Sequence, residues 1–145
     1  MSGDAQAETY KAQGNAALQA GRFEEAAGLY TKAIEKDPNC AVYFSNRSSA
    51  RCSLKRFGEA LDDASEAVSL KPDWYKGHAR RGAALSGLGR PEEACRAFER
   101  ASQLDVGNAQ LVAMMEKEKK AAVAQLAAKE KAAPSDDAQR AALMS

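Results

Sequence analysis

Apolar and polar positions along most of the chain follow the spacing of amphipathic helices. Apolar or small residues return at intervals of three and four, which is the period of one helical face. Glycine and proline interrupt this pattern at regular places: Gly21 and Gly89 lie within two of the segments, and Pro38 and Pro72 close two of them. Because these residues mark helix ends, we predict short helices that are joined in pairs by tight turns.

The pattern also repeats. Windows that start at Ala7, Ala41 and Tyr75 align without gaps, with a period of 34 residues. The matching columns hold small residues, an arginine, alanines and an aromatic residue: Gly14/Ser48/Gly82, Arg22/Arg56/Arg90, Ala26/Ala60/Ala94, Tyr30/Ala64/Phe98 and Ala33/Ala67/Ala101. This period, with small residues where two helices touch, is typical of the tetratricopeptide repeat, in which each unit is a helical hairpin.

We therefore predict an all-α fold of three tetratricopeptide hairpins in a right-handed superhelix, closed by a C-terminal capping helix. Asn108 is the expected N-cap of that last helix, and the apolar residues after it have helical spacing. The predicted boundaries, in chain order, are a flexible N-terminus (1–6), three hairpins (7–40, 41–74 and 75–108), the capping helix (109–133) and a flexible tail or the start of a further element (134–145).

Composition excludes several classes of function. Lys plus Arg (21) nearly balance Asp plus Glu (20), so no overall field favours nucleic acid or an anionic membrane as a partner. The polar N-terminus carries no secretory signal, and no apolar run has membrane-spanning length. Cys40, Cys52 and Cys95 are widely spaced and odd in number, which favours reduced thiols in the cytoplasm over disulfides or a zinc site.

Catalysis and cofactors are not expected either. The sequence has no glycine-rich phosphate loop, no nucleophile near a base and no acidic cluster, so we predict no enzyme activity, no cofactor and no metal. His78 is the only histidine, and its place in the repeat favours a packed ring over a catalytic or metal-binding one.

Function is therefore expected on the face of each first helix that lines the concave groove. Three cations and two amides gather there: Lys11, Asn15, Asn46, Lys76 and Arg80. Lys76 and Arg80 lie four residues apart on one helix, where like charges repel. A bound anion relieves this repulsion, and a carboxylate is the obvious candidate because an arginine can hold both of its oxygens.

The stretches YKAQGNAAL, YFSNRSSA and KGHARRG resemble the carboxylate-clamp tetratricopeptide domains of co-chaperones. In that family, two lysines, two asparagines and an arginine hold the C-terminal Glu-Glu-Val-Asp tail of 70-kDa or 90-kDa heat-shock proteins. The resemblance assigns these roles to Lys11, Asn15, Asn46, Lys76 and Arg80, which match in type and spacing.

The resemblance also implies a division of labour within the groove. The first three clamp residues are expected to hold the main-chain carboxylate of the last residue, and the last two its aspartate side chain. A shallow surface for the penultimate valine is expected from Leu18, Ser49, Cys52 and Ala83.

A second interpretation of the same sequence is a protein–protein scaffold or a self-associating domain whose groove binds a helix or another C-terminal peptide. The long Ala-rich helix after Asn108 has apolar spacing that could pair with a second copy. We expect a monomer that recognises chaperone tails.

Overall fold

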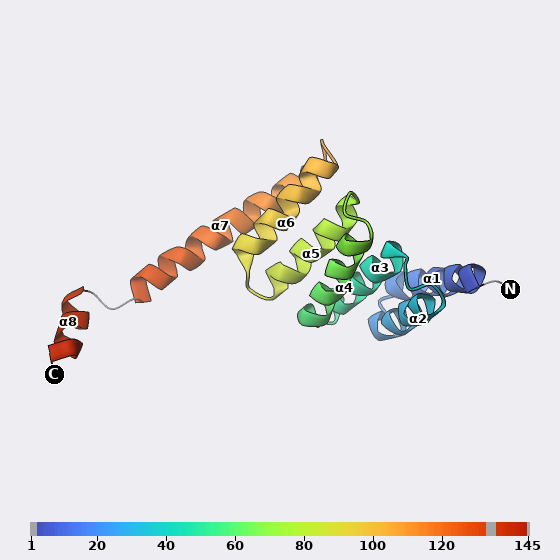
Figure 1. Cartoon of the computed structure of the whole chain (residues 1–145), viewed down its shortest axis with the longest axis horizontal. Coiled ribbons are helices and arrows are strands. Elements are labelled where there is room, and N and C mark those ends of the chain that lie inside the picture. Colours follow the sequence, from blue (N-terminus) through green and yellow to red (C-terminus); the bar gives the residue numbers. More distant parts are fainter. Residues whose placement is uncertain (1–2, 133–135, 145) are drawn as a thin grey trace.

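The computed structural model describes residues 3–132 and 136–144, and helices connected by short turns make up this part of the chain. In chain order the helices are α1 (Gly3–Gln19), α2 (Phe23–Lys36), α3 (Ala41–Ser53), α4 (Phe57–Leu70), α5 (Tyr75–Gly87), α6 (Pro91–Leu104), α7 (Ala109–Ala132) and α8 (Asp136–Met144). The first six pair into three stacked hairpins, and α7 packs along α6 (Figure 1). The predicted all-α arrangement of helical hairpins with a capping helix is confirmed.

Glycine lets the two helices of the first and third hairpins approach closely. A Cβ atom at Gly14 would lie 2.6 Å from Cε1 of Tyr30, and one at Gly82 would lie 2.9 Å from Cε1 of Phe98. Each aromatic ring therefore rests on bare helix backbone. These contacts explain why the aligned columns carry a small residue in the first helix and a ring in the second.

The second hairpin solves the same packing problem without a ring. Ala64 occupies the place of the aromatic residue, and Ser48 that of the glycine. Both are fully buried, and the Ser48 hydroxyl donates a 2.8 Å hydrogen bond to the backbone carbonyl of Ala60. A buried hydroxyl needs such a partner, because burying it unpaired costs free energy.

The core is thin and rich in alanine, as expected for closely packed helices. Its largest cluster joins the third hairpin to the capping helix through Leu85, Ala94, Ala97, Phe98, Ala101 and Leu111. Asn108 caps α7 as predicted, because its Oδ1 accepts hydrogen bonds from the backbone N–H groups of Gln110 (3.1 Å) and Leu111 (3.3 Å). The cap fixes where α7 starts and so seats Leu111 in the core.

The turn inside each hairpin uses a left-handed residue at the same place in the repeat. Gly21 has φ of 78° and Gly89 has φ of 72°, as expected from their position between two helices. The second hairpin carries Lys55 there, with φ of 59°, which is a conformation that costs a residue with a Cβ atom about 1 kcal/mol.

Helices are present in both segments that were predicted as ends of the chain. The N-terminus 1–6 was expected to be flexible, but α1 already begins at Gly3, with Asp4 in the first turn, where a carboxylate suits the helix dipole. The tail 134–145 was expected to be flexible or the start of a further element, and α8 (Asp136–Met144) is such an element. Residues 1, 2, 133–135 and 145 lie outside the described part of the chain.

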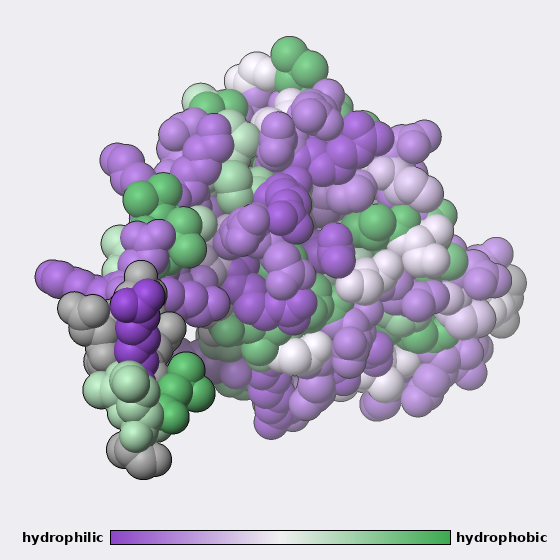
Figure 2. All heavy atoms as spheres, turned by 60° about the vertical axis from the view of Figure 1, so that its left-hand side comes forward, coloured by the Kyte–Doolittle hydropathy of each residue, from purple (hydrophilic) through white to green (hydrophobic). Residues whose placement is uncertain are grey.

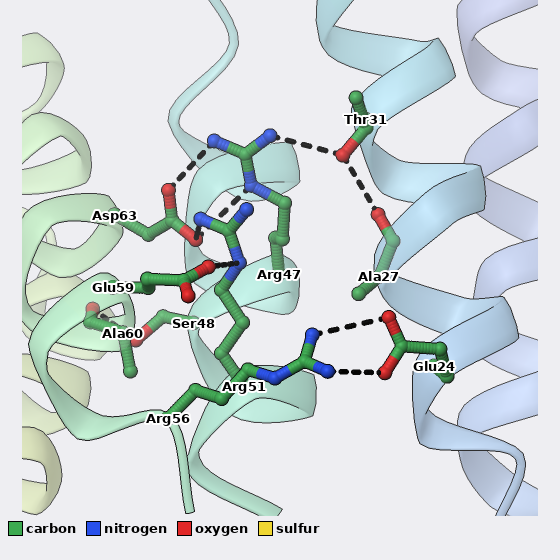
Figure 3. Close-up of polar contacts among 10 residues, drawn as sticks. All are labelled: Glu24, Ala27, Thr31, Arg47, Ser48, Arg51, Arg56, Glu59, Ala60 and Asp63. Atoms are coloured by element: carbon green, nitrogen blue, oxygen red, sulfur yellow. Dashed lines mark hydrogen bonds and ion pairs between the residues drawn. The ribbon is translucent and has the colours of Figure 1, made fainter. Parts of the chain in front are cut away.

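A buried polar network ties the first two hairpins together (Figure 3). The Asp63 side chain is only 4% exposed, and its carboxylate accepts hydrogen bonds from Nη2 (2.7 Å) and Nε (3.0 Å) of Arg47. Nη1 of Arg51 donates to the same carboxylate at 2.9 Å, and Nη1 of Arg47 reaches Thr31 Oγ1 on α2 at 3.0 Å. One carboxylate thus binds two arginines, of which Arg51 also pairs with Glu59, and the network links α2, α3 and α4. The repeat columns gave no sign of this network.

Candidate functional site

The five predicted clamp residues come from α1, α3 and α5, which are the first helices of the three hairpins. Helix α3 contacts both α1 and α5, so these helices form one layer of the stack. Lys11 and Asn15 lie one turn apart on α1, Asn46 lies on α3, and Lys76 and Arg80 lie one turn apart on α5.

The two asparagines are in direct contact. Nδ2 of Asn46 donates a 3.2 Å hydrogen bond to Oδ1 of Asn15, and the Tyr30 hydroxyl donates to the same oxygen at 2.6 Å. Two donors on its carbonyl oxygen fix the orientation of the Asn15 amide. Its NH2 group, which has no partner among the described residues, is left as a donor.

Lys11 is already paired. Its Nζ lies 2.7 Å from Oε2 of Glu8, and the other oxygen of Glu8 accepts a 2.8 Å hydrogen bond from the Tyr43 hydroxyl. The hydrogen bonds from Lys11 and then Tyr43 lower the pKa of Glu8, while burial and Glu8 raise the pKa of Tyr43. A ligand carboxylate at Lys11 must therefore compete with an ionised Glu8.

Lys76 and Arg80 have no such partner. Neither makes a hydrogen bond or an ion pair with any residue in the described ranges, and Nε of Arg80 is buried without an acceptor. Burial raises the pKa of Tyr30 and of Cys52, and the positive charge of Arg80 partly offsets both increases. Arg80 is half-buried, whereas Lys76 is exposed one turn away on the same helix, α5.

The predicted surface for an apolar ligand residue is half-buried throughout. Its members come from α1, α3 and α5: Leu18, Ser49, Cys52 and Ala83. Leu18 packs against the core cluster of the first hairpin and Ala83 against that of the third. Their role in contacting a valine stays a prediction.

Gly87, which shares this face in the sequence pattern, has a packing role. A Cβ atom there would clash with the ring of Phe57, so the packing of α5 on α4 favours a glycine at this point. His78 is half-buried, with Nε2 2.8 Å from the backbone oxygen of Pro72.

Two other kinds of site find no support in residues 3–132 and 136–144. No group of three or more His, Cys, Asp or Glu side chains there could hold a metal ion. No helix in the same ranges is both long and apolar enough to span a bilayer.

Known proteins share this architecture. The tetratricopeptide repeat family matches residues 7–40. The first TPR domain of Spaghetti (RPAP3), solved with the HSP90 peptide SRMEEVD, is 34% identical with a TM-score of 0.80, over 83% of this chain and 95% of that one. The chain is a tetratricopeptide repeat (TPR) domain. The second TPR domain of human RPAP3, solved with the HSP70 peptide SGPTIEEVD, is also 34% identical, with a TM-score of 0.77 over 81% of this chain and 98% of that one.

Longer proteins contain a similar TPR domain. The Hsp70-Hsp90 organizing protein of Triticum aestivum is 50% identical over 118 residues, which is 81% of this chain and 20% of that protein. Heat shock protein STI1 of Saccharomyces cerevisiae is 48% identical over 104 residues, or 70% of this chain and 18% of that protein. The chain thus spans about a fifth of the length of these curated relatives.

Two functional features of this TPR domain escaped the sequence analysis. The pairing of Lys11 with Glu8 was not foreseen, although their i, i+3 spacing is a signal for it. Tyr30 was identified only as the aromatic residue of a repeat column, and its hydroxyl also orients Asn15. No local pattern indicates that second role, because the two residues are on different helices.

Proposed function

We propose that this TPR domain binds the C-terminal tails of 70-kDa or 90-kDa heat-shock chaperones through a carboxylate clamp. One observation carries the proposal: Lys76 and Arg80 are unpaired, and Arg80 holds a buried N–H without an acceptor. Buried polar groups are nearly always hydrogen-bonded, and each specific exception calls for an explanation. A peptide carboxylate brings the acceptors and the negative charge that these two cations lack.

Two carboxylates at the end of one peptide account for all five clamp residues. Lys11 and the free amide donors of Asn15 and Asn46 would hold the main-chain carboxylate. Lys76 and Arg80 would hold the carboxylate on the last side chain. Each charge-assisted hydrogen bond contributes about 1.5–3 kcal/mol, so a few of them can anchor a short tail.

The solved relatives support this choice of ligand. The two RPAP3 domains were solved with peptides that share the ending EEVD. The half-buried surface of Leu18, Ser49, Cys52 and Ala83 would contact the valine of such a tail. In this proposal the chain is the chaperone-recognition module of a cytoplasmic co-chaperone, and it contributes binding without catalysis.

Titration calorimetry of the whole chain with SRMEEVD and SGPTIEEVD tests the proposal. Each peptide is used with a free and with an amidated C-terminus. We expect the free acids to bind, with affinity falling as ionic strength rises, and amidation to weaken binding at least tenfold. Binding that is equal for both forms, or absent for both, contradicts the clamp.

A matched pair of charge reversals locates the contact. Lys76→Glu should abolish binding of the free-acid peptides, because it places a negative charge in the clamp. Lys117→Glu makes the same change on the exposed surface of α7 and should leave binding unchanged. Equal effects of the two variants would show that general electrostatics, and not the clamp, attracts the peptide.

Self-association through α7 is the second candidate function. Val123 and Leu126 on this helix are 68% and 59% exposed. Figure 2 shows, however, that hydrophilic residues separate the hydrophobic patches on the face it displays. Sedimentation at increasing concentration tests this candidate: a dimer that is lost on Leu126→Glu supports it, and a monomer at all concentrations rejects it.

A further inference from the structure

A cavity of about 190 Å³ adjoins the clamp on the side of α7. Its α5 wall includes Lys76 and Arg80, the two unpaired cations. Its opposite wall is the start of α7, with Asn108, Gln110, Leu111 and Met114. The capping helix therefore contributes directly to the space in front of the two cations.

The walls differ in what they can offer a ligand. Asn108 is committed to the fold, because its Oδ1 caps α7 and its Nδ2 donates a 2.9 Å hydrogen bond to Asp105. The side-chain amide of Gln110 has no hydrogen-bond partner in the described ranges. Leu111 is buried and Met114 is half-buried, so they form the apolar part of the wall that α7 contributes. The cavity therefore has cations on one side, and a free amide with apolar side chains on the other. This combination suits a short acidic side chain.

The size of the cavity helps to decide which acidic side chain can bind there. A water molecule takes up about 30 Å³ in the liquid, so the cavity has the volume of several waters. An aspartate side chain places only one methylene and a carboxylate there. One methylene changes affinity about 10–200-fold in a hydrophobic pocket that fits its ligand closely. A space of about 190 Å³ leaves room for the single methylene by which glutamate is longer than aspartate.

We propose that this cavity receives the side chain of the last ligand residue, and that Gln110 and Met114 determine which side chains fit. The domain then accepts a peptide that ends in glutamate about as well as one that ends in aspartate. This inference rests on the proposed clamp. It adds α7 as the element that sets specificity at the last position.

Calorimetry with three free-acid peptides tests the inference: SRMEEVD, the same peptide ending in Glu, and the same peptide ending in Ala. With the natural chain we expect the Glu and Asp peptides to bind within about threefold of each other, and the Ala peptide at least tenfold more weakly. A Glu peptide that binds more than tenfold worse than the Asp peptide overturns the inference.

Two variants of α7 probe the wall itself. Met114→Trp fills the cavity and should weaken the Glu peptide at least tenfold while changing the Asp peptide less than threefold. Gln110→Glu puts a carboxylate before the cations and should weaken the Asp and Glu peptides about tenfold without affecting the Ala peptide. The matched control, Gln103→Glu on the exposed face of α6, should change none of the three.

Gln110→Glu keeps the test meaningful if Met114→Trp does not fold, because Gln110 is exposed and an acidic residue suits the first turn of a helix. Unchanged Asp:Glu:Ala affinity ratios in a folded variant overturn the role of α7. That result leaves the clamp standing, because the Asp peptide still binds. Failure of the clamp itself has a different signature, in which the natural chain binds none of the three free acids.

Discussion

Arg47 and Arg80 occupy neighbouring hairpins and have opposite environments. Arg47, the seventh residue of its repeat window, is held by Asp63 and Thr31. Arg80, the sixth residue of its window, has no partner in the described part of the chain, and its Nε is buried without an acceptor. One step along a helix turns the side chain by about 100°, because there are 3.6 residues per turn.

This rotation of about 100° places Arg47 in a structural role and Arg80 in a recognition role. Arg47 faces the second helices of the stack, where Asp63 completes its hydrogen bonds (Figure 3). Arg80 lies on α5, in the layer of first helices, and no residue of the described ranges accepts a hydrogen bond from its Nε. Residue type alone does not distinguish the two arginines. What distinguishes them is their position in the repeat and whether their hydrogen bonds are complete.

The largest expected effect comes from breaking the complete network. Asp63→Ala leaves Arg47 and Arg51 without their shared carboxylate, and removing one partner of a buried pair costs about 3–5 kcal/mol in the free energy of unfolding. Chemical denaturation measures the loss. Asp62→Ala, at the exposed neighbouring position, should stay within about 0.5 kcal/mol of the natural chain. Equal losses would contradict the structural role of the network.

Thiol alkylation can test whether the peptide covers the first-helix layer, because Cys52 lies on α3 and Cys95 lies on α6. Burial raises the pKa of Cys52 in the groove and of Cys95 on α6, so both are mainly protonated at pH 7 and both should react faster as pH rises. A peptide at ten times its Kd should slow alkylation of Cys52 about tenfold, because only about one site in eleven is free. Cys95 serves as the control. Equal protection of both thiols would place the peptide elsewhere.

A smaller effect is expected at the one clamp cation that the fold does pair. Glu8→Gln removes the carboxylate that competes for Lys11, so peptide affinity should rise about two- to fivefold, as for an exposed ion pair of about 0.5–1 kcal/mol. Calorimetry measures the change, and Glu66→Gln on the exposed face of α4 is the control. A fall in affinity would show that Glu8 positions Lys11 for the ligand.

The competition by Glu8 should persist at neutral pH. Lys11 and Tyr43 lower the pKa of Glu8, so its ion pair contributes stability above the unfolded-state pKa and loses it only as pH falls through the lower folded-state value. Mutation is therefore a cleaner probe of this pair than acid, which also protonates the ligand.

The sequence predicted the features that repeat. The 34-residue period indicated the hairpins, the turn glycines and the helix face that carries Asn15, Asn46 and Arg80. These features depend on local spacing and recur at a fixed period, the hairpin three times and the turn glycine twice, so they stand out without knowledge of the fold.

Features that depend on partners from different helices were not predicted. Asp63 meets Arg47 and Arg51 only because α3 and α4 pack together. The cavity before Lys76 exists only because α7 begins beside α5. Neither contact has a periodic signature, so each could be found only in the folded chain.

The most direct test of the account is one pair of variants measured in two ways. Unfolding free energy and affinity for SGPTIEEVD are determined for Arg80→Ala and Arg47→Ala. We predict that Arg80→Ala weakens binding by about 1.5–3 kcal/mol and changes stability by less than about 1 kcal/mol. Arg47→Ala should lose several kcal/mol of stability, because it leaves Asp63 short of a partner. An Arg80→Ala variant that binds like the natural chain, or that loses as much stability as Arg47→Ala, would contradict a clamp that the fold leaves unpaired for its ligand.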